Sequence, residues 1–177
     1  MSMEVRPAVD DDVTALADIA ARTFPLACPP ELPRSAVEEF IADHLDETAF
    51  RGYLGADGHT VLVGVDDEGT LRAYALMVDG TSMDAACSHL VRGEPTIGIS
   101  KFYVDPSLHG HGAARTLLDA VVDKARRAGA ESLWLGTNVG NVRAQKFYTR
   151  HGFVERGSRV FVVGGLDNRD VVLEKPL

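Results

Sequence analysis

A glycine-rich turn near the middle of the chain has the residue types of a phosphate-binding site. Within residues 102–114, Gly110 and Gly112 flank His111, and Gly112 is followed by Ala113 and Ala114 at the start of a helical pattern. The first amides of a helix have no partner within the helix and carry about half a positive charge, so they attract anions. Glycine and alanine let an anion approach these amides closely. The turn lacks the Gly-Lys-Ser/Thr of a Walker A loop, and a plain tight turn into a core helix is the alternative interpretation.

A second segment, residues 141–153, strengthens the phosphate-site interpretation. Together the two segments resemble the motifs of the GNAT superfamily of N-acetyltransferases. The second segment matches the pattern Asn-x-x-Ala-x-x-Phe-Tyr-x-x-x-Gly-Phe at Asn141, Ala144, Phe147, Tyr148, Gly152 and Phe153. The first matches Gln/Arg-x-x-Gly-x-Gly/Ala at Gly112 and Ala114, with His109 where Gln or Arg is usual. The resemblance covers about residues 60–175.

The resemblance implies an enzyme that moves an acetyl group from acetyl-CoA to a primary amine by direct attack in a ternary complex. The pyrophosphate of acetyl-CoA would lie on the backbone amides of His109, Gly110, His111, Gly112, Ala113 and Ala114. The pantetheine arm would pair like an extra strand with Phe102, Tyr103 and Val104, whose backbone would also receive the thioester carbonyl. Asn141 and Phe147 would line the other side of the cofactor.

Cationic side chains near these motifs are candidate phosphate partners, although each is equally compatible with a solvated helix face. They are Arg115, Arg143 and Lys146. If the usual Arg side chain of the first motif adds a charge-assisted hydrogen bond, its replacement by His109 weakens cofactor binding by about tenfold to a hundredfold. A metal site at His109, His111 and His151 is not expected, because no acidic or Cys ligand accompanies them.

Family resemblance implies Tyr148 as the general acid beside the sulfur atom. The ordinary pKa is about 10 for tyrosine and about 8.5 for a thiol, so a hydrogen bond to the departing sulfur is the alternative to full proton transfer. The sequence does not identify the general base that removes a proton from the amine. Many relatives carry a Glu in the strand before the turn, and Ser100 stands at that place. The remaining candidates are a water chain, bulk solvent, Glu94, His89 and His44. Lys101 would disfavour a cationic acceptor unless it points away.

The spacing of apolar residues predicts the elements that position these motifs. Helices are expected from the acidic start at residues 10–12 to residue 24, and over 35–45, 48–54, 110–128 and 141–150. Ser35 and Glu38 have the spacing of a capping box, and the proline-rich residues 25–33 predict a loop. Strands are expected over 60–65, 71–78, 96–104, 132–135, 153–163 and 168–173.

This order of elements predicts an α/β three-layer fold with a mixed, mostly antiparallel central sheet flanked by helices. The length of 177 residues fits one domain. We expect a helical acceptor-side segment over residues 1–55 and a sheet with the acetyl-CoA-binding core over residues 60–175.

Charge and hydropathy indicate which classes of binding partner to expect. Residues 1–90 carry 17 acidic and 5 basic side chains, whereas residues 91–177 carry 9 and 13. The net charge of −8 disfavours nucleic acid as a partner. No uncharged run approaches the ~20 residues of a membrane span, and no signal peptide is evident, so we expect a cytoplasmic protein without a membrane partner. Two cysteines cannot form a disulfide framework. Whether the protein forms a homodimer is not decided by the sequence.

The acceptor amine is predicted from weaker signals. An acidic rim attracts cations, and acidic residues cluster around the second predicted helix at Glu31, Glu38, Glu39, Asp43, Asp46 and Glu47. Short matches at residues 22–24, 133–136 and 173–175 are similar to bacterial polyamine (spermidine/spermine) N-acetyltransferases. Alternatives are a peptide or protein N-terminus, a small amino compound, or a catalytically inactive sensor that binds acyl-CoA.

Overall fold

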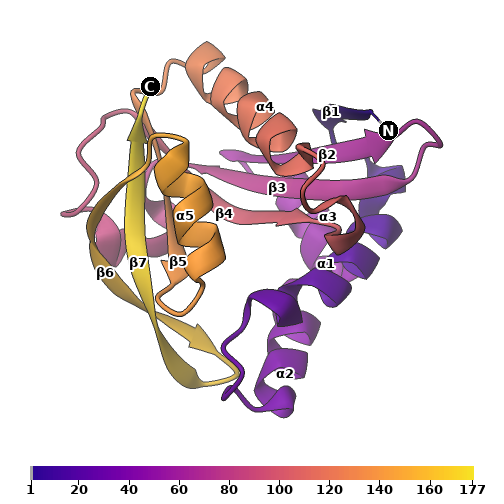
Figure 1. The fold of residues 1–177 in the computed structure, drawn as a ribbon, viewed down its shortest axis with the longest axis horizontal. Helices are drawn as coiled ribbons and strands as arrows, with labels where there is room; N and C mark the ends of the chain where they lie inside the picture. Colours follow the sequence, from indigo (N-terminus) through magenta and orange to yellow (C-terminus); the bar gives the residue numbers. More distant parts are fainter. Residues whose placement is uncertain (1) are drawn as a thin grey trace.

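A seven-stranded sheet separates two groups of helices in the computed structural model, which describes residues 2–177 (Figure 1). The strands lie in the order β1-β2-β3-β4-β5-β7-β6, and the β4–β5 pair is parallel while the other pairs are antiparallel. The strands are β1 (Met3–Pro7), β2 (His59–Asp66), β3 (Leu71–Asp79), β4 (Thr96–Val104), β5 (Ser132–Asn138), β6 (Val154–Val163) and β7 (Leu166–Pro176). This arrangement confirms the predicted mixed, mostly antiparallel α/β fold.

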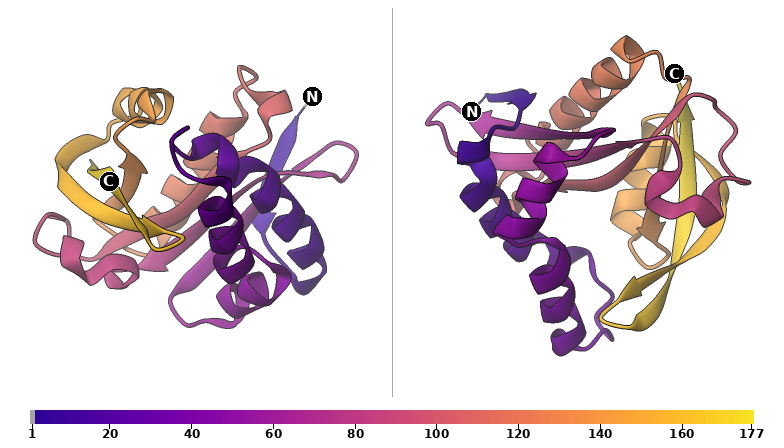
Figure 2. Two further views of the ribbon diagram at one scale, coloured as in Figure 1. Left: turned by 90° about the horizontal axis from the view of Figure 1, so that it is seen from below. Right: turned by 180° about the vertical axis from the view of Figure 1, so that it is seen from behind.

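Five α-helices cover the sheet, and they divide between its two faces. They are α1 (Val13–Ala27), α2 (Arg34–His44), α3 (Glu47–Gly55), α4 (Ala113–Arg127) and α5 (Val142–Arg150). One hydrophobic cluster joins α1, α2 and α3 to the sheet, and another joins α4 and α5 to the opposite face. Figure 2 shows the first group gathered on one side of the sheet, away from α4. Within residues 2–177, none of the helices combines the length and apolar character needed to cross a bilayer.

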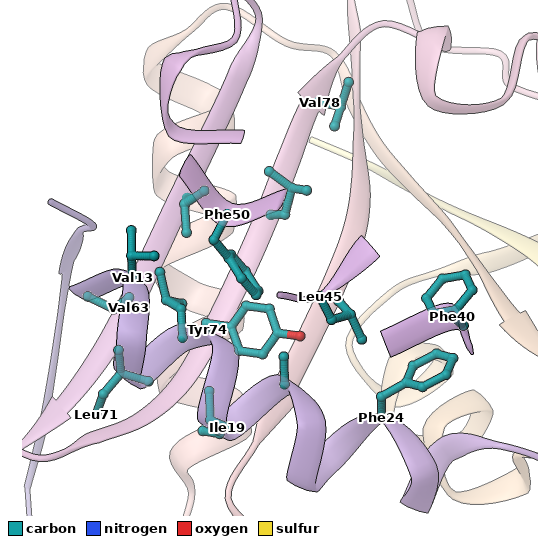
Figure 3. Close-up of a cluster of buried hydrophobic side chains, with 14 of the residues drawn as sticks. Val13, Ile19, Phe24, Phe40, Leu45, Phe50, Val63, Leu71, Tyr74 and Val78 are labelled. Carbon is teal, nitrogen blue, oxygen red and sulfur yellow. The ribbon is translucent and has the colours of Figure 1, made fainter. Parts of the chain in front are cut away.

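Side chains of the central strands alternate between the two faces of the sheet and so contribute to both hydrophobic clusters. On β3, Tyr74 and Leu76 face α1 and α3, whereas Ala75 and Met77 face α4, because successive side chains of a strand point to opposite faces. Figure 3 shows the first cluster, with Tyr74 beside Phe50 in its middle. At one end of this cluster, Phe24 of α1 stacks on Phe40 of α2 with ring centroids 4.5 Å apart (Figure 3).

A buried carboxylate of β7 joins β5, β6 and the segment before β4 at one end of the parallel β4–β5 pair. Glu174 accepts hydrogen bonds from Ser132 Oγ, Arg156 Nε and the amides of Arg92 and Gly93. Burial alone would raise the pKa of Glu174, but these donors lower it below its ordinary value. β4 and β5 pair only from Thr96 to Gly98 on the β4 side. Beyond that point the two strands separate, and the β5-facing edge of β4 has no paired strand within residues 2–177.

Several predicted boundaries were wrong for local reasons. The sequence analysis missed β1, a short edge strand that ends at Pro7. Helix α1 continues through Pro25 to Ala27, because a proline in the last turn removes only one helical hydrogen bond. Helix α2 begins at Arg34 after Pro33, so Ser35 lies inside the helix and does not form the predicted capping box. Strands β5 and β7 are longer than predicted, since residues beyond the apolar core extend their pairing.

Candidate active site

The glycine-rich turn joins β4 to α4 and leaves a row of unpaired amides. Gly110 and Gly112 have φ angles of 83° and 78°, so α4 begins at Ala113, three residues later than predicted. The first amide of this helix that finds a backbone acceptor is that of Thr116, which donates to the Gly112 carbonyl at 3.0 Å. The amides of Gly112, Ala113, Ala114 and Arg115 have no acceptor within the described chain. A Cβ atom placed on Gly112 would have no neighbour within 4 Å, so the space in front of these amides is open.

A groove of about 470 Å³, here called the outer groove, runs from this turn along β4 to α5. Eight of the residues predicted to bind the cofactor or act in catalysis line it, and these are Phe102, Tyr103, Val104, His109, Ala114, Asn141, Phe147 and Tyr148. The remaining four, Gly110, His111, Gly112 and Ala113, form the turn at its end. The tertiary structure therefore brings the two sequence motifs to one surface, with β4 on one side and α5 on the other.

Two smaller pockets continue from the outer groove into the protein. The central pocket, about 90 Å³, lies where β4 and β5 separate and is lined by Ser100, Lys101, Thr137 and Tyr148 among others. The inner pocket, about 110 Å³, extends from there toward α1, α2 and the β6–β7 hairpin. Ala27, Tyr103 and Asn141 border all three spaces. The three spaces therefore meet at these residues, and ligands could enter from two sides.

Tyr148 of α5 stands where the outer groove meets the central pocket. Its ring is held by the rings of Phe102, Phe147 and Phe153, with centroids 5.9, 5.3 and 5.2 Å away. The hydroxyl forms no hydrogen bond with any residue in the described part of the chain, so it is available to a ligand. Burial raises the pKa of Tyr148 well above its ordinary value of 10. The phenol therefore remains a neutral hydrogen-bond donor at physiological pH.

His109 and Arg143 form a pair at the turn end of the outer groove. The Arg143 Nη1 atom lies 2.8 Å from His109 Nδ1. Because arginine only donates, the acceptor of this bond is His109 Nδ1. The guanidinium of Arg143 thus supplies a cation beside the turn position where relatives of the first motif carry Gln or Arg.

Asn141 has a structural task that the sequence analysis did not assign to it. Its side-chain oxygen accepts a hydrogen bond from the Ala144 amide at 3.1 Å and caps α5. Its neighbour Gln145 donates to the carbonyls of Asn138 and Val139 and fixes the loop before the helix. These bonds orient α5 so that Phe147 and Tyr148 face β4.

None of the three side chains proposed as the base lines the central or inner pocket. Glu94 and His89 are exposed and lie before β4, while His44 is exposed at the end of α2 and packs on Phe40. Ser100 does line both pockets, and it is the bulged residue of β4, without a partner on β3. Its hydroxyl cannot act as the predicted carboxylate would, so the base must be sought elsewhere.

The inner pocket contains charged residues that the sequence analysis did not select. Asp170 of β7 is 4% exposed and is paired with Arg159 of β6, which also contacts Asp84 at 3.5 Å. Arg159 packs over Gly136 of β5, where a Cβ would collide with the guanidinium. A single charged residue in an alternating strand gives no sequence signal for such a site. The acidic side chains expected to form a rim do not line this pocket, and they are Glu31, Glu38, Glu39, Asp43, Asp46 and Glu47.

Lys101 points away from Tyr148, toward the opposite face of the sheet. Its Nζ atom lies 5.2 Å from the ring centroid of Tyr53 on α3. Burial lowers the pKa of Lys101 from 10.5 to about 8. The folded protein therefore binds this proton less tightly than the unfolded chain does. The charge destabilises the fold fully below pH 8, and this cost disappears as the pH rises from 8 to 10.5.

We therefore expect Lys101→Met to raise the free energy of unfolding at pH 7 by up to about 3 kcal/mol, because each pKa unit corresponds to about 1.4 kcal/mol. The advantage should shrink when urea unfolding is repeated at pH 9 and pH 10. Lys124→Met, at an exposed lysine of α4, serves as the control and should change stability by less than about 0.5 kcal/mol. Equal effects of the two variants at pH 7 would contradict this assignment.

Comparison with known proteins places the chain in a family. Residues 14–153 match the model of the acetyltransferase (GNAT) family. An uncharacterised N-acetyltransferase of Mycobacterium tuberculosis is 35% identical over 166 residues, covering 94% of this chain and 98% of the relative. Among solved structures, PaiA N-acetyltransferase of Thermoplasma acidophilum in complex with coenzyme A has a TM-score of 0.80 at 15% identity, with 100% of both chains covered.

The ribosomal-protein-S18-alanine N-acetyltransferase of Escherichia coli has a TM-score of 0.69 at 18% identity, covering 99% of this chain and 94% of that protein. At 15% and 18% identity, the two solved structures support the fold alone. The family is shown by the family model and by the mycobacterial relative. The chain therefore belongs to the acetyltransferase (GNAT) family and is an N-acetyltransferase of that family.

Proposed function

We propose that this protein transfers an acetyl group from acetyl-CoA to a primary amine by direct attack, with both substrates bound at once. The observation that carries the proposal is that the outer groove, the central pocket and the inner pocket meet at Ala27, Tyr103 and Asn141, with Tyr148 lining the outer groove and the central pocket. Two substrates that enter from these two sides can react in the central pocket without a covalent enzyme intermediate. The thiol that lines the inner pocket is Cys28, and burial raises its pKa from 9.0 to about 11, which disfavours the thiolate that a covalent intermediate on it would need.

The residues of the outer groove fit acetyl-CoA. The unpaired amides from Gly112 to Arg115, at the start of α4, suit its pyrophosphate. The unpaired edge of β4 from Ile99 to Val104 suits an extended amide-containing arm. Arg143, held by His109, suits a phosphate oxygen. We assign the predicted cofactor-binding residues these roles, and Asn141 supports them by capping α5.

Acetyl-CoA, when bound, supplies an acetyl group activated as a thioester. The chain's own groups then do three things. The backbone of β4 at the Ser100 bulge donates to the carbonyl oxygen as negative charge develops there. Tyr148 donates a hydrogen bond to the departing sulfur. The apolar rings of Phe102, Phe147 and Phe153 fix the direction of that hydroxyl and keep water from its other side.

The pocket favours an acceptor with one ammonium group over a polyamine. A polyamine is the acceptor that the acidic N-terminal half suggested, but those carboxylates lie outside the inner pocket. The charged groups that do line it are one carboxylate, Asp170, and two cations, Lys101 and Arg159. The rings of Phe24, Phe40 and Phe161 also line it, and the Arg159 guanidinium lies 5.2 Å from the centroid of the Phe161 ring. A monoamine with an apolar substituent matches this lining.

The test is acceptor-dependent release of free thiol from acetyl-CoA. The acceptors are spermidine, 2-phenylethylamine, alanine amide, free amino acids and an aminoglycoside. We expect release with a monoamine to exceed release with spermidine at equal concentration. Binding of acetyl-CoA without release for any acceptor would instead indicate the acyl-CoA sensor, and the absence of binding would exclude both functions.

A further inference from the structure

A buried carboxylate in the inner pocket has one oxygen atom that no protein group uses. The hydrogen bond from Arg159 Nε, at 3.2 Å, and the contact from Nη2, at 3.1 Å, both reach Oδ2 of Asp170. No residue from 2 to 177 donates a hydrogen bond to Oδ1. Among the fully buried side-chain polar atoms of residues 2–177, the Tyr74 hydroxyl alone lacks a hydrogen-bond partner. Asp170 Oδ1, which also has no partner, is therefore not fully buried, and it is accessible from the inner pocket.

We propose that the Asp170 carboxylate binds the acceptor ammonium through Oδ1 and receives its proton, which makes Asp170 the catalytic base of the transfer. The proposal rests on the function proposed above. A desolvated anion in a pocket needs donors, and an alkylammonium brings three N–H donors and a compensating charge. A neutral or anionic acceptor would leave Oδ1 unpaired or repelled.

The position of Asp170 suits this role. Tyr103 borders the outer groove, the central pocket and the inner pocket. The inner pocket, which Asp170 lines, and the central pocket, which Tyr148 lines, also share Ser100, Gly136 and Thr137. An amine bound at Asp170 therefore lies in a pocket that is continuous with the one lined by Tyr148.

Burial makes Asp170 a better proton acceptor than a surface aspartate, and the neighbouring charges adjust this effect. Burial raises the pKa of Asp170, and Arg159 on β6 opposes that rise. Asp84 faces Arg159 from its other side and shares its charge. From β4 the neutral Tyr103 faces the pocket, while the Lys101 ammonium points toward Tyr53. Burial lowers the pKa of a bound ammonium as it raises that of the carboxyl, so the two approach each other.

The proton and bond changes balance without another reactant. The ammonium gives one proton to Asp170 and becomes a neutral amine. Its nitrogen forms a bond to the acetyl carbon, and the bond from that carbon to sulfur breaks. The second nitrogen proton passes to the thiolate, which the Tyr148 hydroxyl stabilises. Asp170 releases its proton to water through the inner pocket, so the products are the acetamide, free CoA thiol and one proton.

The test compares Asp170→Asn with Asp84→Asn. Both variants remove one carboxylate partner of Arg159, but only Asp170 lines the inner pocket. The probe is whichever of 2-phenylethylamine, alanine amide and spermidine the natural protein acetylates fastest. We expect Asp170→Asn to lower kcat/KM about 100-fold at pH 7. We expect Asp84→Asn to stay within about threefold of the natural protein, because its carboxylate never touches the acceptor.

The pH dependence separates a base from a structural residue. The Asp170→Asn variant cannot deprotonate a bound ammonium, so it reacts only with amine that is already neutral in solution. The neutral fraction of the amine rises about tenfold for each pH unit below the pKa of the amine. The deficit of Asp170→Asn should therefore shrink by about tenfold for each unit from pH 7 toward that pKa. Thermal unfolding and acetyl-CoA binding of both variants show whether the fold and cofactor site are intact. Full activity of Asp170→Asn at pH 7, or an equal and pH-independent loss in both variants, overturns the proposal. A natural protein that releases no thiol refutes the proposed function itself.

Discussion

Replacing Tyr148 with phenylalanine lowers kcat by about 100-fold to 1,000-fold, the usual effect of losing one donor to developing charge. The ring stays, so its packing on Phe102, Phe147 and Phe153 is preserved. The hydroxyl has no protein partner within residues 2–177, so its removal leaves no buried group unpaired. Steady-state kinetics with saturating acetyl-CoA measure the loss, and calorimetry should show the Kd for acetyl-CoA changed by less than about threefold.

Tyr53→Phe is the matched control for this variant. Its hydroxyl donates to the His44 carbonyl on the surface of the α2–α3 region and does not line the cavity. We expect unchanged kcat in that variant, with a small loss of stability. Because burial keeps the phenol of Tyr148 neutral, the natural protein should show no loss of activity from its ionisation below pH 10. A kcat of Tyr148→Phe equal to that of the natural protein would refute the role of the Tyr148 hydroxyl at the departing sulfur.

Gly112→Asp is expected to weaken binding of acetyl-CoA by up to about 1,000-fold. Two charges about 4 Å apart repel by ~1 kcal/mol in water and ~4 kcal/mol near a protein surface, and the new carboxylate faces the pyrophosphate. The fold should tolerate the change, because a Cβ at Gly112 meets nothing within 4 Å and Asp accepts a left-handed backbone better than most residues. Calorimetric titration with acetyl-CoA measures the affinity.

Two controls isolate the charge in this experiment. Gly112→Asn has the same shape and backbone requirement without the charge, so it should lose less than about tenfold in affinity. Gly129→Asp puts the same residue at another left-handed glycine, φ 80°, at the far end of α4 and should leave affinity unchanged. The deficit of Gly112→Asp should also fall with added salt. If the Asp and Asn variants bind equally well, the pyrophosphate does not lie on this turn.

The sequence predicted the central elements well and their ends poorly. The bounds of β4 were correct, because a run of β-branched and aromatic residues between a proline and the turn is unambiguous. Helix α4 was predicted to start at Gly110, but the two left-handed glycines delay it to Ala113. Strand β1 was missed because five residues ending in proline give little periodic signal, and its pairing with β2 is decided by burial against α4.

By itself the sequence indicated the family and the fold class, and it selected residues that line the outer groove. These follow from short motifs, since a phosphate-binding turn and the helix carrying Tyr148 each depend on residues within one segment. The inner pocket was decided only by the tertiary structure. Lys101, Arg159 and Asp170 lie on three strands that the fold brings to one pocket, and Arg159 faces Asp170 across the β6–β7 pair. Desolvation and ion pairing are properties of that packing, so a free carboxylate oxygen at Asp170 could not be read from the order of the residues.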